Sequence, residues 1–281
     1  MQVINTKRKL VDHLSSLGKN RELGLVPTMG ALHKGHVSLV EKAVSENALV
    51  VVSIFVNPTQ FDNQEDLKKY PKTFDKDLKL LEVISDEIII FAPWVEEIYD
   101  NGVQSKSYDF HGLEKVMEGA FREDHFNGVG TIVEALLLVV EPDKVYFGEK
   151  DFQQLLIIKK LIKNQDIPVK VIACPIVREP NGLAMSSRNE RLTKTLRKEA
   201  SFIYKTLQAA KQKFGTNSAN YVLNWVREQF LKHPDLRLEY VEIADAENLT
   251  PVQEKKPNLK YRAFVAVYAD EIRLIDNIAL N

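Results

Sequence analysis

One stretch of this chain decides its fold: Val26-Pro27-Thr28-Met29-Gly30-Ala31-Leu32-His33-Lys34-Gly35-His36-Val37-Ser38-Leu39-Val40. The short apolar run Leu23–Val26 leads into it and predicts a strand that ends at Pro27. Beyond the loop, Val37, Val40 and Val44 recur at helical spacing. The stretch therefore predicts a strand, a glycine-bearing loop, and a helix that begins at a His-x-Gly-His element.

The predicted start of this helix suits a phosphate group. The first N–H groups of a helix have no partner within the helix and carry a partial positive charge. Gly35 has no Cβ, so the backbone can come close to a ligand. His33 and His36 can donate hydrogen bonds to phosphate oxygens. Together these features predict an anion-binding site where the strand ends.

Three other interpretations of this motif are weaker. Gly30 and Gly35 have the glycine spacing of a P-loop, but His36 and Val37 stand where its lysine and hydroxyl residue belong. No set of cysteine or carboxylate ligands lies at zinc spacing from the two histidines. Two polar loop histidines without a role remain as an alternative, which the strand–loop–helix context makes improbable.

The composition predicts an ordinary soluble globular protein, because 44% of the 281 residues are hydrophobic and 27% are charged. A formal net charge of -1 gives no argument for binding nucleic acid or an anionic membrane. Cys174 is the single cysteine, so no intrachain disulfide can form. No apolar stretch reaches membrane-spanning length, and the first residues lack the core of a signal peptide. We therefore expect a cytoplasmic enzyme.

Strand and helix patterns alternate through the first part of the chain. Strands are predicted at 23–26, 48–56, 87–91, 145–148 and 169–177, and helices at 6–17, from about 36, and at 75–84, 131–140 and 152–163. This alternation is typical of the α/β class, with a parallel sheet and helices on both of its faces. Ligands of such sheets bind beyond the carboxyl ends of the strands. The loops after Val26, Val56 and Phe147 are predicted to lie there.

The pattern changes near residue 176. Two longer helices are predicted at 193–214 and 219–232, followed by strands at 237–243, 263–268 and 272–275. We therefore expect two domains, a catalytic domain over residues 1–176 and a smaller α+β domain over residues 177–281.

A second candidate loop follows the strongest buried strand. The amides of Asn57 and Gln60 can both donate and accept hydrogen bonds, which suits a small ligand with hydroxyl and carboxylate groups. Ordinary turn chemistry, with Asn57-Pro58 ending the strand, explains the same residues equally well.

A third candidate loop follows Gly148. Lys150 can neutralise phosphate, and Asp151 can hold ribose hydroxyls or simply cap the next helix. Gln154 lies one helical turn beyond Lys150, on the same side.

Two polar loops complete the candidates. In the loop 178–189, Asn181-Gly182 predicts a turn, and Ser186-Ser187-Arg188 forms a plausible anion clamp. An interdomain turn with Ser187 capping the next helix is the alternative interpretation. The loop 121–129 carries Arg122 and is the least specific of the set.

Taken together, the segments Pro27–Leu39, Ser53–Phe61, Phe147–Leu155 and Arg178–Asn189 closely resemble the pantoate–β-alanine ligase family. This family belongs to the His-x-Gly-His nucleotidyltransferases, which share a Rossmann-like core. The resemblance implies that the chain ligates pantoate and β-alanine to pantothenate with ATP. The reaction would pass through a pantoyl-adenylate and release pyrophosphate and AMP, with Mg²⁺ accompanying ATP. It also implies a homodimer, and a C-terminal domain that closes over the ATP site.

The resemblance also assigns roles to individual residues. It implies that His33 and His36 stabilise the phosphates during adenylation, and that further side chains bind them: Lys150, Ser186, Ser187 and Arg188. It places the remaining ATP-binding residues at Pro27, Thr28, Met29, Gly148, Asp151, Val177 and Met185. Pantoate would be held by Gln60 and Gln154 in a pocket shaped by Pro27 and Met29, and β-alanine would approach Asn57.

The chain departs from the family pattern at three places. Lys34 stands where an acidic residue is common, Glu123-Asp124 replaces the usual Pro-Gly before His125, and Asn181 replaces a common aspartate. None of these changes removes a proposed ligand residue. Another adenylyltransferase with the same core, or a nucleotide sensor without activity, remain as alternative functions.

Overall fold

The computed structural model describes residues 1–18, 21–61, 64–99 and 102–281. The chain forms two compact units. The first consists of Met1–Glu149 and Gln154–Pro175, and the second of Lys150–Gln153 and Ile176–Asn281. The short segment Lys150–Gln153 thus groups with the second unit, although residues of the first unit flank it on both sides.

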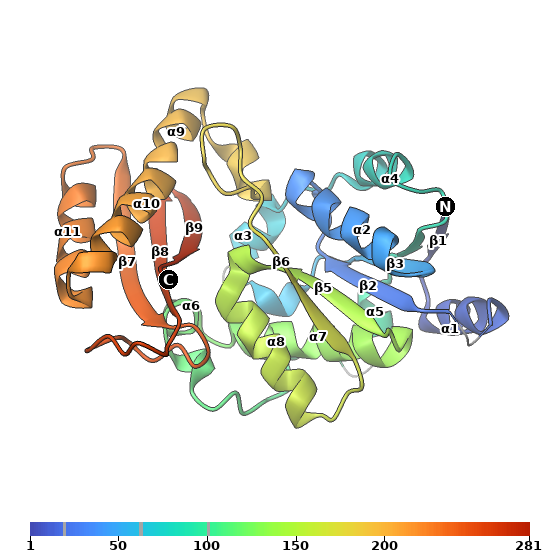
Figure 1. Ribbon diagram of the computed structural model, residues 1–281. Coiled ribbons are helices and arrows are strands. Elements are labelled where there is room, and N and C mark those ends of the chain that lie inside the picture. The colour runs from blue at the N-terminus through green and yellow to red at the C-terminus, as the bar shows by residue number, and fades with distance from the viewer. Residues whose placement is uncertain (19–20, 62–63, 100–101) are drawn as a thin grey trace. The chain divides into compact units, whose positions relative to one another are not determined.

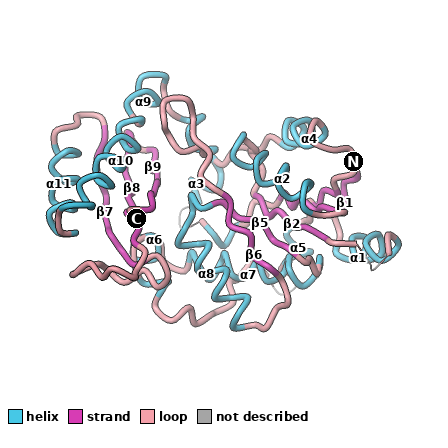
Figure 2. Tube along the Cα trace, viewed as in Figure 1, coloured by secondary structure: helices cyan, strands magenta, loops and turns pink. Residues whose placement is uncertain are grey.

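A six-stranded parallel sheet forms the centre of the first unit, in the order β1-β4-β3-β2-β5-β6 (Figures 1 and 2). The strands are β1 (Gln2–Ile4), β2 (Leu23–Thr28), β3 (Leu49–Ile54), β4 (Ile89–Phe91), β5 (Lys144–Gly148) and β6 (Lys170–Cys174). Every strand pair is parallel, which confirms the predicted α/β class. Because β2 pairs with β3 on one side and β5 on the other, the strand order reverses there, as at the ligand-binding switch point of such sheets.

Helices cover both faces of this sheet. The helices that lie wholly or mainly in the first unit are α1 (Lys7–Ser16), α2 (Lys34–Glu46), α3 (Gln64–Lys69), α4 (Phe74–Glu82), α5 (Val95–Ile98), α6 (Glu118–Phe121), α7 (His125–Val140) and α8 (Phe152–Asn164). Short 3₁₀ turns lie at Pro58–Gln60, Leu113–Lys115 and Glu149–Asp151. Helices α2 and α4 contact each other on one face, and α1 contacts α7 on the other, as right-handed crossovers require (Figure 1).

The core between the sheet and the α2–α4 layer follows from the sequence pattern. The buried strand residues are Val26, Val50, Val52, Ile90 and Tyr146, and they meet Leu39, Val40, Ala43 and Leu81 of the helices. Each such aliphatic side chain contributes about 1.5–3 kcal/mol by leaving water. None of the helices in the described ranges combines the length and apolarity that crossing a membrane requires.

The second unit is an α+β structure around a three-stranded antiparallel sheet, in the order β7-β8-β9. Its strands are β7 (Leu236–Asp245), β8 (Tyr261–Ala269) and β9 (Ile272–Ala279), and its helices are α9 (Lys194–Glu199), α10 (Ser201–Thr216) and α11 (Ala219–Leu231). A 3₁₀ turn covers Ser187–Arg191. Helices α10 and α11 pack on the sheet and on each other.

Several predicted boundaries were wrong. The helix predicted at 193–214 is two helices that meet at Ala200, whose backbone stays right-handed helical (φ -59°, ψ -17°), so neither glycine nor proline marks the break. The strand predicted to reach Val177 ends at Cys174, because Pro175 has no N–H for the ladder. Strand β9 continues four residues beyond Ile275, through Asp276 and Asn277, which are buried and paired.

Helix α7 begins six residues before its predicted start at Thr131. Gly128 was predicted to lie in the loop 121–129, but it and Gly130 both lie within the helix, where neighbours come too close for a side chain. A Cβ on Gly128 would lie 2.3 Å from the carbonyl oxygen of Thr59, and one on Gly130 would lie 2.8 Å from the Tyr108 ring. These glycines permit close packing inside the helix.

We predict that Gly128→Ala destabilises the protein by about 1–3 kcal/mol, because α7 must move away from the Thr59 carbonyl. Gly215→Ala is the matched control, since a Cβ there meets nothing within 4 Å in helix α10. The control should gain about 0.5–1 kcal/mol from the better helix propensity of alanine. Thermal unfolding midpoints of both variants measure the difference, and an equal shift in both would contradict the close-packing argument.

Candidate active site

The loop between β2 and α2 is fixed by a buried carboxylate that the sequence did not reveal. Asp77 of α4 is 2% exposed, and its two carboxylate oxygens accept hydrogen bonds from the backbone N–H groups of Ala31 (2.9 Å) and Leu32 (2.8 Å). Thr73 Oγ1 also donates to Asp77, at 3.1 Å. Gly30 and Ala31 both have positive φ, at 75° and 50°. The carboxylate therefore stabilises a tight turn directly before the histidine motif.

The two histidines cap helix α2 together. His33 is the N-cap residue, and its Nδ1 accepts a hydrogen bond from the backbone N–H of Gly35 at 3.1 Å. His36 Nδ1 accepts one from the backbone N–H of His33 at 3.3 Å, which completes a capping box. The two rings are stacked, with their centroids 4.0 Å apart. Imidazoles here perform the task that Ser/Thr and Glu/Gln usually perform at a helix start.

This capping arrangement determines the tautomer of both rings. An Nδ1 atom that accepts a hydrogen bond carries no proton, so each neutral imidazole has its N–H at Nε2. The site thus holds two oriented Nε2–H donors. The cap also corrects the expectation of bare backbone donors at this helix start, because His33 occupies the N–H of Gly35.

Pro27, Thr28 and Met29 form the end of β2 and the first loop position. Thr28 is buried, and its hydroxyl donates to the carbonyl of Ser53 at 2.7 Å and accepts from the N–H of Gly30 at 3.2 Å. Its side chain therefore holds the loop. Pro27 and Met29 are half-buried at the carboxyl edge of the sheet.

Asn57 is buried, and both ends of its side-chain amide form hydrogen bonds within the protein. Its side chain is 0% exposed. Asn57 Nδ2 donates to the carbonyl of Gly128 at 3.0 Å, and Oδ1 accepts from Tyr99 and from Thr59 Oγ1, the latter at 3.2 Å. Burial raises the pKa of Tyr99, so its phenol stays protonated as a donor. Both ends of the Asn57 amide are engaged, and in this conformation it supports the turn rather than facing a substrate.

Gln60 is held through its backbone by a loop whose role the sequence left open. Its carbonyl accepts hydrogen bonds from Arg122 Nη2 and His125 Nδ1, both at 2.9 Å. His125 Nε2 then accepts from Arg122 Nη1 at 3.0 Å, since a guanidinium can only donate. The Gln60 side chain remains half-buried. Arg122 and His125 therefore position the turn that carries Gln60.

The departure at Glu123-Asp124 is accommodated in this loop. Asp124 adopts φ 58°, the left-handed region that favours glycine. Its carboxylate accepts a hydrogen bond from Asn127 Nδ2 at 2.8 Å, one helical turn later. The acidic pair therefore leaves the contacts of Arg122 and His125 with Gln60 in place.

The segment after β5 divides between the two units. Gly148 ends the strand in the first unit, whereas Lys150 and Asp151 belong to the second. Lys150 Nζ lies 3.5 Å from Asp151 Oδ1, and the Asp151 side chain is exposed. Gln154 is half-buried in α8 and groups with the first unit. Lys150 lies in the 3₁₀ turn Glu149–Asp151, which leads directly into α8, where Gln154 lies.

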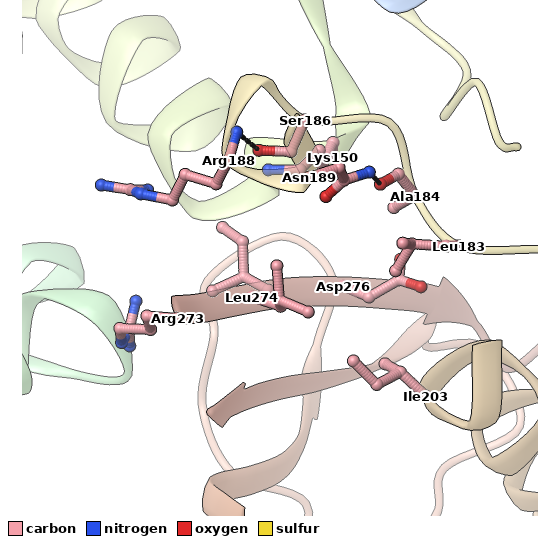
Figure 3. A pocket seen from close by; sticks show the side chains of 11 residues that line it. Lys150, Leu183, Ala184, Ser186, Arg188, Asn189, Ile203, Arg273, Leu274 and Asp276 are labelled. Carbon is pink, nitrogen blue, oxygen red and sulfur yellow. Dashed lines mark hydrogen bonds between the residues drawn. The ribbon is translucent and has the colours of Figure 1, made fainter. Parts of the chain in front are cut away.

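A cavity in the second unit brings together several predicted phosphate ligands (Figure 3). Its lining includes Lys150, Ser186, Arg188, Asn189 and Asp276. Ser186, rather than Ser187, caps the following 3₁₀ turn, because its Oγ accepts from the N–H of Arg188 at 3.3 Å. Its hydroxyl proton stays available for a further hydrogen bond. Ser187 is half-buried at the start of the same turn.

A hairpin precedes these residues and confirms the predicted turn at Asn181-Gly182. Gly182 has φ 96°, and its N–H donates to the carbonyl of Glu179 at 2.8 Å. The backbone N–H of Met185 donates to the carbonyl of Val177 at 3.0 Å, which brings these two predicted adenine-site residues together.

Cys174 carries no catalytic chemistry in this arrangement. It is buried at the end of β6, and burial raises the pKa of its thiol to about 11. A thiol in that state is a poor nucleophile at neutral pH.

The chain matches known proteins over nearly its whole length. The family model described as pantoate-beta-alanine ligase matches residues 2–279. The chain belongs to the pantoate–β-alanine ligase family. A pantothenate synthetase of Christiangramia forsetii is 55% identical over 282 residues and covers 100% of both chains. One from Bacteroides thetaiotaomicron is 46% identical over 279 residues, covering 99% of this chain and 98% of its own.

Solved structures of this family resemble the structure of this chain over its full length. The crystal structure of pantothenate synthetase from Thermus thermophilus has a TM-score of 0.91 at 38% identity and covers 100% of this chain and 99% of its own. The ligase from Francisella tularensis, complexed with beta-gamma ATP and beta-alanine, has a TM-score of 0.82 at 36% identity, covering 100% and 98%. The chain is thus a ligase that condenses pantoate with β-alanine in an ATP-dependent reaction. The adenylyltransferase and sensor alternatives are set aside.

We predict that Asp77→Ala, a substitution in α4, lowers activity by disturbing the loop that positions His33 and His36. The change leaves the N–H groups of Ala31 and Leu32 without their acceptor, at a cost of about 1–3 kcal/mol each. Pantoate-dependent ATP–pyrophosphate exchange should fall at least tenfold. Asp75→Ala, an exposed position on the same helix, is the control and should behave like wild type. Wild-type exchange by Asp77→Ala would contradict the positioning role.

Proposed function

We propose that the ligation proceeds by adenylation followed by aminolysis. A carboxylate oxygen of pantoate attacks the α-phosphorus of ATP, and pyrophosphate leaves. The amine of β-alanine, in its neutral form, then attacks the pantoyl carbonyl, and AMP leaves. The first step brings two anions together, so donors must be oriented where negative charge builds up. The capped histidine pair is the observation that carries this proposal.

His33 and His36 are proposed to donate to phosphate oxygens through Nε2–H. The support is geometric, since both Nδ1 atoms are already used in the helix cap. A preorganised neutral donor needs no proton transfer and little reorganisation as charge develops.

Lys150, Ser186, Ser187 and Arg188 are proposed to bind the phosphates, because a cavity already gathers Lys150, Ser186 and Arg188. Val177 and Met185, joined by a backbone hydrogen bond, are proposed to contact the adenosine, with Gly148 and Asp151. Pro27, Thr28 and Met29 would contribute backbone and apolar contacts at the end of β2. For Thr28, the proposed contribution is through its backbone, since its hydroxyl is engaged.

Gln60 and Gln154 are proposed to hold pantoate through their half-buried side-chain amides, in a pocket shaped by Pro27 and Met29. The hydrogen bonds from Arg122 and His125 to the Gln60 carbonyl support this assignment. They hold the backbone of Gln60 and do not involve its side-chain amide. For β-alanine, Asn57 stays a prediction that requires its amide to leave Gly128, Tyr99 and Thr59.

Mg²⁺ is proposed to arrive bound to ATP. In the described ranges, no group of three histidine, cysteine or carboxylate side chains could hold a metal ion. Mg²⁺ prefers phosphate oxygens and water as ligands, which supports its arrival with ATP. Both proposed steps are assigned to the chain's own residues and the substrates.

The remaining expectations rest on the family resemblance. They are a homodimer and closure of the second domain over ATP; the cytoplasmic location is an expectation from the composition.

His33→Asn is predicted to separate capping from phosphate binding. Asparagine is a good N-cap residue, so the helix start should persist, but the Nε2–H donor is lost. Pantoate-dependent ATP–pyrophosphate exchange should fall about 10²–10³-fold, as it should in His36→Ala, while the thermal midpoint of His33→Asn stays near that of wild type. Wild-type exchange in both variants would refute the donor role.

Gln60→Ala and Gln154→Ala are predicted to weaken pantoate use far more than ATP binding. Each removes an amide whose loss leaves ligand oxygens unpaired, at about 1–3 kcal/mol. Calorimetric titration with pantoate and with a non-hydrolysable ATP analogue distinguishes the two ligands. Gln165→Ala, at an exposed position just beyond α8, is the control. Loss of ATP affinity with pantoate affinity retained would place the pocket elsewhere.

A further inference from the structure

Lys150 follows β5 closely in the chain but belongs to the second unit, which contains the C-terminal strands β7, β8 and β9. The segment Lys150–Gln153 belongs to the second unit, although β5 and most of α8 belong to the first. Some contact in the second unit must therefore fix the position of Lys150. We propose that Asn277 of β9 is a positioning residue for Lys150, acting through the Lys150 backbone.

The link is a buried side-chain-to-backbone hydrogen bond. Asn277 Nδ2 donates to the carbonyl oxygen of Lys150 at 2.8 Å, across 127 positions of sequence. Asn277 is 2% exposed, so water does not compete for this bond. Its Oδ1 accepts from Arg262 Nη1. Because a guanidinium only donates, the oxygen of the amide must face Arg262 and the NH₂ must face Lys150.

A second contact fixes the same segment from β8. The guanidinium of Arg262 lies over the ring of Phe152, with its carbon 4.0 Å from the ring centroid. Phe152 also packs against Phe264, with the ring centroids 5.9 Å apart. Arg262 therefore contacts Asn277 and Phe152 at once. The segment is held at the Lys150 carbonyl and, two residues later, at an aromatic ring.

Asp276, the neighbour of Asn277 in β9, holds the hairpin that leads to Ser186, another proposed phosphate-binding residue. Asp276 pairs with Arg178 through two hydrogen bonds, of 2.6 and 3.0 Å. Arg178 donates to the carbonyl of Gly182 at 3.1 Å and lies 3.6 Å over the ring of Tyr204. The hairpin that leads to Ser186 is thereby joined to the strand that holds Lys150. Figure 3 shows Lys150, Ser186 and Arg188 around one cavity, with Asp276 on its wall.

Two adjacent residues of β9 thus position the proposed phosphate-binding residues. Asp276 positions the hairpin that leads to Ser186, and Asn277 positions the backbone of Lys150. The ammonium of lysine is a point charge on a flexible stem, so its backbone position decides where the charge can reach. Small misplacements of a charged group at a reacting centre lower rates strongly. Loss of the Asn277 donor should therefore weaken triphosphate binding through Lys150.

Asn277→Asp is the decisive variant. It retains the acceptor for Arg262 but places a carboxylate oxygen, which cannot donate, opposite the Lys150 carbonyl. Asn281→Asp is the matched control, because Asn281 also accepts from a backbone N–H and donates to a carbonyl, that of Leu259, at 2.8 Å. The measurement is the Kd of a non-hydrolysable ATP analogue by calorimetry, together with the Kd of pantoate.

We expect Asn277→Asp to raise the Kd of the ATP analogue about tenfold, the equivalent of one buried hydrogen bond, with pantoate binding unchanged. Asn281→Asp should bind both ligands like wild type. In a Lys150→Ala background, Asn277→Asp should have no further effect, because the residue that it positions is gone. A merely structural role of Asn277 would instead give the same fold-loss in both backgrounds, which would overturn the inference.

The inference rests on the proposed phosphate role of Lys150, and the experiment separates the two. If Lys150→Ala binds the ATP analogue like wild type, the role of Lys150 fails. If Lys150→Ala weakens binding but Asn277→Asp does not, the positioning role of Asn277 fails. Should Asn277→Asp not fold, Phe152→Leu removes the second anchor without adding charge. It should also raise the Kd of the analogue, and only when Lys150 is present.

Discussion

The contact between the Asp77 carboxylate and the backbone of Ala31 and Leu32 is the constraint on which the histidine site depends. A non-glycine residue at positive φ, such as Ala31 in this loop, is costly unless its surroundings hold it. Asp77 holds it from α4, a helix that packs beside α2 on the same face of the sheet. The turn then delivers His33 to the N-cap of α2. The position of His33 therefore depends on the sheet, on the packing of α2 against α4, and on the loop between β2 and α2.

The double use of the two imidazoles has a chemical consequence. The Nδ1 atom of each histidine accepts a hydrogen bond at the helix start, so the N–H group of each neutral ring is at Nε2. The site therefore differs from a P-loop, which binds phosphate with backbone N–H groups and a lysine. In the first unit, the two histidines instead present oriented imidazole N–H groups.

A buried ion pair between Asp276 and Arg178 holds the hairpin of the second unit against β9. Burial raises the pKa of Asp276, and the adjacent Arg178 opposes that shift by favouring the ionised form. Buried ion pairs often add little net stability, because desolvation offsets the attraction. Their advantage here is geometric, since a bidentate pair fixes direction as well as distance. The Arg178 guanidinium can therefore join the hairpin to β9 in a single orientation.

The sequence by itself determined the alternation of strands and helices, the parallel α/β sheet, the loop at the end of β2, and the family. These features depend on local periodicity and on motifs within about fifteen residues. The tertiary structure alone decided which residues support the site. Asp77 acts across 46 positions, Arg122 across 62 and Asn277 across 127, and no pattern in the chain marks such partners. The hydrogen bonds of the Asn57 amide with Tyr99, Thr59 and Gly128 likewise form only because α7 packs close to the turn. Local sequence sets which conformations are accessible, but the contacts that satisfy a buried polar group exist only after distant segments pack together.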